Sequence, residues 1–168
     1  LPLMSGKRYG SDIDKDAILL YQAMQSGWVP PSELTEEQYL FLKTSDPSPL
    51  RGFAAFGCSF GGIKFSGYAR CAQSRNYAAG SCRSLQRSFK SVTPDVVFSH
   101  GSYARVAVPT DSLVYCDPPY EGTAGYSTKF DHVAFWDWAR ATSEFATVLV
   151  SEYQAPDDFE LVWEKERR

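Results

Sequence analysis

The chain has 168 residues, enough for one globular domain with a sizeable core. Its composition, with 43% hydrophobic, 22% charged and 15% aromatic residues, excludes a disordered or collagen-like chain, and no apolar run approaches the roughly 20 residues of a membrane helix. The net charge is −3, the four cysteines lack paired CxxC spacing and there are only two histidines, so we expect a cytoplasmic protein without a metal site, a disulfide framework or a membrane segment.

The charge is unevenly distributed along the chain. Residues 1–46 carry a balance of −3 and residues 95–168 a balance of −7, whereas residues 47–94 carry seven Lys and Arg and no acid. In that middle region the bases are interleaved with aromatic residues and glycines, a pattern that favours contact with phosphates and nucleobases. A flexible basic insert with a few core aromatics is the alternative. We divide the chain into these three regions.

The first region is predicted to contain a strand and two helices. The predicted elements are a strand over 7–12 and helices over 15–26 and 36–43. Asp14 is the expected N-cap of the first helix, which stops near Gly27. Thr35 and Gln38 have the spacing of a capping box at the start of the second helix.

The basic middle region has a less regular pattern. Residues 46–49 read as a linker, and the Gly- and Phe-rich residues 52–68 show no clean period, so we predict a loop with short strands there. Residues 74–90 predict a polar helix whose bases face outward.

The third region alternates short apolar runs of the buried-strand type with one helix, for which Asp131 is the expected cap. The predicted elements are strands over 96–99, 113–116, 147–151 and 161–163 and a helix over 130–143. Strands that alternate with helices predict a parallel α/β sheet.

One motif carries chemistry: Asp117-Pro118-Pro119-Tyr120, directly after the strand at 113–116. In open α/β sheets, ligands bind beyond the carboxyl ends of the strands. The Asp117 carboxylate and the Pro118 carbonyl can accept hydrogen bonds from an exocyclic amine, while Tyr120 stacks on the ring and the prolines fix the carbonyl direction. An amine held in this way can attack a methyl donor. The alternative is a structural loop, in which Asp117 bonds a nearby backbone amide.

Several segments resemble one enzyme family. Residues 114–123, with 129–131 and the Trp-rich helix that follows, resemble the catalytic segment of Dam-like DNA adenine N6-methyltransferases, especially the small phage and prophage enzymes. Three further segments are similar, in the family's order, to the acidic turn after its second strand, the Gly/Phe segment before its DNA-recognition helix and the strand after its catalytic helix. These are residues 11–16, 56–70 and 148–153.

The resemblance implies a Rossmann-like, S-adenosylmethionine-dependent methyltransferase sheet with an inserted basic DNA-recognition region. It implies methyl transfer to the N6 amine of adenine in double-stranded DNA after base flipping. By this resemblance the flipped adenine is held by Asp117, Pro118, Pro119 and Tyr120. The cofactor is bound by Asp12, Ser102 and Tyr103. The DNA is contacted by Arg51, Lys64, Arg70 and Arg75.

Alternatives stay open at several positions. The alternative for Asp12 is a second helix-capping acid beside Asp14, and the alternative for each of the four bases is a solvated charge. Glu121 and Lys129 flank the motif and either line the base pocket or face solvent. Ser102 stands where many relatives have an acidic residue.

No Phe-x-Gly-x-Gly cofactor loop precedes Asp12, so we expect a chain that is incomplete at both ends. The competing functions are a DNA-binding remnant without activity, and an amino-methyltransferase that acts on cytosine, RNA or a protein glutamine. We further expect a monomer.

Overall fold

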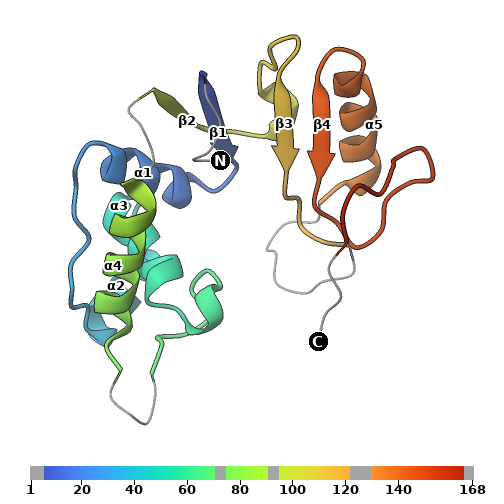
Figure 1. Cartoon of the computed structure of the whole chain (residues 1–168). Helices are drawn as coiled ribbons and strands as arrows, with labels where there is room; N and C mark the ends of the chain where they lie inside the picture. Colours follow the sequence, from blue (N-terminus) through green and yellow to red (C-terminus); the bar gives the residue numbers. More distant parts are fainter. Residues whose placement is uncertain (1–5, 71–74, 91–94, 122–129, 165–168) are drawn as a thin grey trace. The chain divides into compact units, whose positions relative to one another are not determined.

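A computed structural model describes residues 6–70, 75–90, 95–121 and 130–164. The chain divides into two compact units, residues 1–106 and residues 107–168 (Figure 1). Each unit contains one pair of parallel strands together with helical segments, so the structure is of the mixed α/β class.

The first unit holds a parallel strand pair at its two ends in sequence, with helical segments between. Its elements are β1 (Arg8–Asp12), α1 (Lys15–Gln25), α2 (Glu36–Thr44), α3 (Pro49–Gly52), the π-helical turn η1 (Phe53–Gly57), the 3-10 turn η2 (Phe60–Gly62), α4 (Tyr77–Phe89), β2 (Val96–His100) and the 3-10 turn η3 (Tyr103–Arg105). β1 and β2 pair in register, with Asp12 opposite His100 at their carboxyl ends. The strands predicted over 7–12 and 96–99 and the helices predicted over 15–26, 36–43 and 74–90 are confirmed. The predicted parallel α/β sheet is confirmed only as parallel pairs, because the described strands form two separate two-stranded sheets.

The predicted helix caps are also confirmed. The Asp14 carboxylate accepts hydrogen bonds from the N–H groups of Asp16 and Ala17 at the start of α1. The Thr35 side chain accepts from the Gln38 N–H, and the Gln38 side chain accepts from the Thr35 N–H, which completes the capping box of α2. These caps satisfy N–H groups that have no partner inside the helix.

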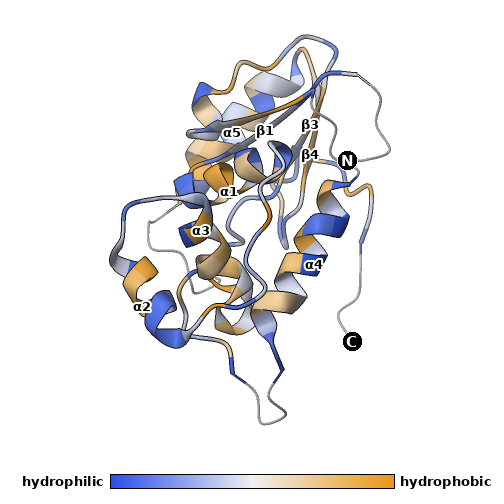
Figure 2. Ribbon diagram, turned by 90° about the vertical axis from the view of Figure 1, so that its left-hand side faces the viewer, coloured by the Kyte–Doolittle hydropathy of each residue, from blue (hydrophilic) through white to orange (hydrophobic). Residues whose placement is uncertain are grey.

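A single apolar cluster joins the helices of the first unit. Its buried members are Leu20, Met24, Leu34, Tyr39, Leu42, Phe53, Ala54, Cys58, Ala78 and Cys82. Figure 2 shows strongly hydrophilic residues between the apolar positions of α4, as expected for a helix with one buried face. α3 lies close against α1 at Gly52, where an added Cβ atom would lie 2.3 Å from the Asp16 carbonyl oxygen.

The prediction for residues 52–68 was wrong in its main feature. The helical turn of α3 continues into η1, and the segment forms one isolated bridge, between Ser59 and Tyr68, instead of short strands. Phe53 and Ala54 are completely buried, so the segment forms part of the core. The irregular period arises because a π-helical turn shifts the buried positions out of α-helical spacing.

The second unit contains β3 (Leu113–Cys116), α5 (His132–Ser143) and β4 (Thr147–Val150). β3 and β4 are parallel neighbours, and the Asp131 side chain caps α5 by accepting from the Ala134 N–H, both as predicted (Figure 1). β3 is not a fully buried strand: Leu113 and Tyr115 are 44% and 56% exposed, because alternate side chains point to opposite faces.

The strand predicted at residues 161–163 is absent from the described part of the unit. Leu161, Val162 and Trp163 are more than 70% exposed and lie outside any strand. A short apolar run forms a strand only where a neighbouring strand supplies hydrogen-bond partners, and β propensity does not reveal whether such a neighbour exists.

Candidate functional site

The 117–120 loop leaves the sheet where two parallel strands end. β3 and β4 stay in register up to Cys116 opposite Val150. The ladder continues one step further, because the Ser151 N–H donates to the Cys116 carbonyl over 2.9 Å. The loop and the segment after β4 therefore start side by side, at the edge where parallel sheets bind ligands.

Tyr120 is held by side chains that follow β4. Its hydroxyl shares a hydrogen bond of 2.9 Å with the Ser151 hydroxyl, and its ring lies edge-on to Tyr153 with 4.7 Å between the centroids. The ring of Tyr120 is half-buried. These contacts constrain the ring without enclosing it, which suits an aromatic that stacks on a planar ligand.

The other residues of the motif differ in exposure. Pro118 is buried and Pro119 half-buried, so the loop backbone is anchored, whereas Asp117 is exposed. The structural alternative requires Asp117 to bond a nearby backbone amide, yet its carboxylate accepts no hydrogen bond from the described residues. A carboxylate at this position is available to accept a hydrogen bond from a ligand amine.

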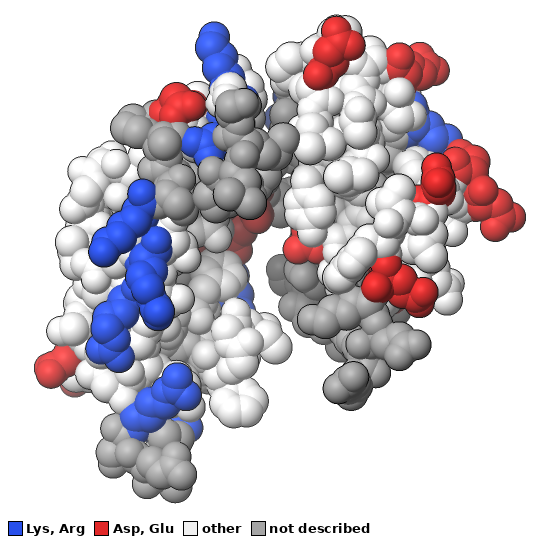
Figure 3. Space-filling view, viewed as in Figure 1, with Lys and Arg blue, Asp and Glu red and all other residues white. Residues whose placement is uncertain are grey.

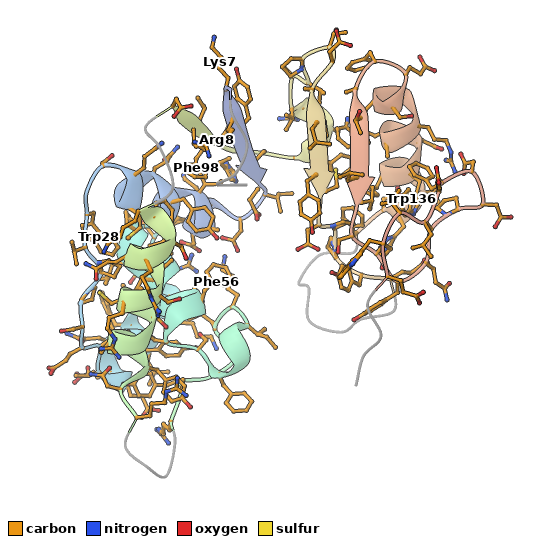
Figure 4. The ribbon with its side chains drawn as sticks, in the orientation of Figure 1. Lys7, Arg8, Trp28, Phe56, Phe98 and Trp136 are labelled. Atoms are coloured by element: carbon orange, nitrogen blue, oxygen red, sulfur yellow. The ribbon has the colours of Figure 1, made fainter. Side chains whose placement is uncertain are left out.

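A cavity of about 240 Å³ lies beside the motif, within the second unit. It is lined by Glu121, His132, Val133, Trp136, Gln154, Ala155 and Pro156. Trp136 projects from α5 (Figure 4), and its ring packs edge-on against Phe159 with 4.7 Å between the centroids. Glu121 lines this cavity and is also exposed, and none of residues 117–120 lines it, so the assignment of Glu121 to the base pocket stays a prediction. Lys129 lies outside the described residues.

Glu152 connects the segment after β4 to the motif. Its carboxylate accepts from the Glu121 N–H over 3.3 Å and from the Tyr153 N–H over 2.7 Å. Burial raises the pKa of Glu152, and the carboxylates of Glu121 and Asp117 act in the same direction, against the Glu121 N–H and His132. The end of this sheet is therefore rich in carboxylates.

Cys116, at the end of β3, is not an activated nucleophile. Burial raises the pKa of the Cys116 thiol to about 11, and it does the same for Cys58 in the first unit. Both thiols therefore stay protonated at neutral pH.

The predicted cofactor residues share one edge of the first unit. The Gly101 N–H donates to the Asp12 carbonyl over 2.9 Å, which places the chain leading to Ser102 and Tyr103 beside the end of β1. The Asp12 carboxylate accepts from the Asp14 N–H over 2.7 Å, which supports its capping interpretation, but its second oxygen accepts nothing from the described residues. Ser102 caps η3 by accepting from Ala104.

Two of the four predicted DNA-contacting bases form ion pairs with acids at the start of α1. The Arg51 guanidinium pairs with the carboxylate of Asp16, which is 1% exposed, and donates to the Leu42 carbonyl over 3.0 Å. Lys64 forms ion pairs with the same carboxylate at 2.9 Å and with Asp14 at 2.6 Å. Both cations neutralise buried or half-buried acids, so each has a structural function whether or not DNA is bound.

The other two bases lie at the surface. Arg70 pairs with Glu36 at the start of α2, although its own side chain is 68% exposed. The Arg75 guanidinium lies over the Tyr77 ring at 5.4 Å from its centroid, just before α4. Their assignment as DNA contacts stays a prediction.

A different set of bases forms a stripe on α4. Arg83, Arg87 and Lys90 are exposed and spaced four and three residues apart, so they share one face of the helix and its end. None of them has an ion-pair partner among the described residues. Figure 3 shows Lys and Arg side chains in a row over the region where Figure 1 draws α4. We call these three residues the α4 stripe.

Sequence reasoning does not single out two parts of this arrangement. The α4 stripe belongs to the basic region but is not separated there from the paired bases, although its helical spacing is a usable signal. The segment with Ser151 and Glu152 is singled out by resemblance, but its contacts to Tyr120 and Glu121 are not predicted, because they join residues 31 positions apart.

Among the residues that the structure describes, no cluster of His, Cys, Asp and Glu has the arrangement of a metal site, and no helix is long and apolar enough to cross a membrane. The sequence matches no protein-family model, and it matches no curated protein.

Proposed function

We propose that the protein transfers a methyl group from S-adenosylmethionine to the N6 amine of adenine in double-stranded DNA. The observation that carries the proposal is the 117–120 loop: an exposed Asp117 carboxylate that accepts no hydrogen bond from the described residues, and a constrained, half-buried Tyr120 ring, at the carboxyl end of a parallel strand. The proposal includes a Rossmann-like methyltransferase sheet, to which parallel strand pairs with helices between them are suited.

The chemistry requires a nitrogen whose lone pair points toward the methyl carbon. Hydrogen bonds from the N6 hydrogens to Asp117 and to the Pro118 carbonyl favour a tetrahedral nitrogen whose lone pair is withdrawn from conjugation with the ring, while Tyr120 stacks on the base. S-adenosylmethionine supplies a methyl group bound to a positively charged sulfur. The new carbon–nitrogen bond forms as the carbon–sulfur bond breaks with its electrons left on sulfur, and the surplus N6 proton passes to solvent.

Residues of the first unit are of the kinds that an adenosine-containing cofactor requires. The second Asp12 oxygen, which accepts nothing from the described residues, can accept hydrogen bonds from ribose hydroxyls at the end of β1, and Tyr103 in η3 after β2 offers an aromatic ring for the adenine. We infer that Asp12 acts both as a backbone acceptor for α1 and as a ribose ligand.

The α4 stripe is the best-supported contact for the DNA backbone. Phosphate contacts need cations that are exposed and not already neutralised. Arg83, Arg87 and Lys90 meet both conditions, whereas Arg51 and Lys64 already neutralise the Asp14 and Asp16 carboxylates.

The test is methyl transfer from labelled S-adenosylmethionine to an adenine-containing duplex, with nucleoside analysis of the product. We expect N6-methyladenine, and a rate at least about 100-fold lower with Asp117→Ala, since removing one polar group that stabilises the reacting atoms has that effect in other enzymes. Asp157→Ala, which removes an exposed carboxylate from a turn in the same unit, is the matched control and should leave the rate unchanged.

Each other outcome identifies a competing function. Labelled methyl groups found in cytosine, in RNA or on a protein glutamine would show that this group, and not adenine in DNA, is the substrate. Salt-sensitive DNA binding without any calorimetric heat from S-adenosylmethionine would favour the DNA-binding remnant. An Asp117→Ala variant as active as Asp157→Ala would remove the motif from the reaction.

A further inference from the structure

Tyr120 is tied to one short segment by two contacts of different kinds. Ser151 and Tyr153 follow β4 two residues apart, and both contact Tyr120. One provides a hydroxyl at 2.9 Å from the Tyr120 hydroxyl, and the other an aromatic edge at 4.7 Å from the ring centroid. The hydrogen bond fixes the far end of the ring, and the edge contact restricts its tilt.

Glu152, between Ser151 and Tyr153, holds the backbone directly after Tyr120. The Glu152 carboxylate accepts from the Glu121 N–H over 3.3 Å, and Glu121 directly follows Tyr120. The start of the loop is tied through the Ser151 N–H to the Cys116 carbonyl. One three-residue segment therefore restrains the 117–120 loop before it, at Tyr120 and after it.

We propose that Ser151 is a positioning residue, which holds the Tyr120 ring in the plane required to stack on the target base. This inference rests on the proposed function, since it names how that site keeps its geometry. A ring that stacks on a base must keep its position to within a fraction of an ångström. A Tyr120 ring already held by the Ser151 hydroxyl loses less conformational entropy when the base binds than a free ring would. Ser151 itself does not contact the reacting atoms.

The proposal is tested first by structure in solution. With ¹³C-labelled tyrosine, the Tyr120 ring signals, identified through Tyr120→Phe, should shift and broaden in Ser151→Ala. Ser143→Ala removes a hydroxyl that bonds the Arg140 carbonyl at the end of α5, and it should leave these signals in place. Unchanged Tyr120 signals in Ser151→Ala would overturn the positioning role, whether or not the protein is active.

The second test is kinetic. Ser151→Ala should lower kcat for methyl transfer by about 10-fold to 100-fold, with the KM for DNA unchanged, because the α4 stripe still binds the backbone. Ser151→Thr keeps the hydroxyl and should recover most of the rate. Ser151→Ala and Tyr120→Phe remove the same hydrogen bond, so the double variant should be no slower than the slower single variant.

The outcomes separate this inference from the proposed function. An inactive wild-type protein whose Tyr120 signals still respond to Ser151→Ala would contradict the methyltransferase but retain the structural contact. An active wild-type protein with an equally active Ser151→Ala variant, or with additive rate reductions in the double variant, would overturn the positioning role alone.

Discussion

At the residue scale, Gly52 determines how closely α3 approaches α1. Its backbone is in the ordinary right-handed helical region, with φ −59° and ψ −44°, so alanine would be acceptable there on conformational grounds alone. Its missing side chain matters because a Cβ atom would meet the Asp16 carbonyl oxygen, a backbone atom, at 2.3 Å. A clash with backbone can be relieved only by moving the two helices apart.

We therefore predict that Gly52→Ala lowers the free energy of unfolding by roughly 1 to 3 kcal/mol, the usual cost of overpacking a tight core. The measurement is urea unfolding followed by far-UV circular dichroism. Gly80→Ala is the matched control: it lies within α4 with nothing within 4 Å of the added Cβ, and it should stabilise by about 0.5 to 1 kcal/mol through helix propensity. Equal effects of the two changes would contradict the close contact at Gly52.

Single residues also mark the limit of what the sequence reveals. The caps at Asp14, Thr35 and Asp131 were predictable because a cap and its helix are neighbours in sequence. The ion pair between Lys64 and Asp16 spans 48 positions and depends on how the segment folds back on α1. The basic composition of residues 47–94 therefore made Lys64 a candidate DNA contact, but it could not show that Asp16 already neutralises its charge.

At the element scale, the same distinction applies to strands and helices. A capped helix between two parallel strands has strong local signals in the sequence. The predicted bounds of such strands and helices agree with the observed bounds to within about two residues. The turn η1 was missed because its buried residues follow a π-helical spacing. Likewise, the Asp-Pro-Pro-Tyr sequence indicated a site at the end of β3, while the residues that hold Tyr120 follow β4.

The α4 stripe leads to a prediction about a whole helix face. Replacing Arg83, Arg87 and Lys90 together by glutamine should weaken DNA binding at low salt. It should also lower the slope of log K against log salt by about 0.9 for each phosphate that is no longer neutralised, up to about 2.7 for three phosphates. Fluorescence anisotropy with a labelled duplex over a range of salt concentrations measures both quantities.

A charge-matched control separates the α4 stripe from the effect of total charge. Lys7, Lys15 and Arg105 are exposed, lie in the same unit and are outside α4, and their joint replacement by glutamine removes the same three charges. This control should leave the salt slope unchanged. Equally weakened binding in the two triple variants would show that DNA responds to net charge and not to the α4 stripe.

At the scale of the whole molecule, charge is divided between the two units. The first unit, residues 1–106, carries twelve Lys and Arg against eight Asp and Glu, a balance of +4, and residues 107–168 carry five against twelve, a balance of −7. The net charge of −3 alone would repel DNA. The proposed association with DNA therefore depends on the local field of the first unit, which salt screens over about 10 Å at 0.1 M ionic strength.

This dependence on Lys and Arg predicts that DNA binding responds strongly to salt and weakly to pH. Histidine is the only side-chain type whose ordinary pKa gives a change of charge between pH 6 and 8, and neither His100 nor His132 lies in the basic region 47–94. At constant ionic strength, Kd should agree within about twofold at pH 6 and pH 8. With three phosphate contacts, raising salt from 50 to 200 mM should instead weaken binding by about 40-fold. Anisotropy titrations at both pH values and both salt concentrations measure these values of Kd. A tenfold weaker affinity at pH 8 than at pH 6 would indicate that a histidine, and not the α4 stripe, makes a principal contact with DNA.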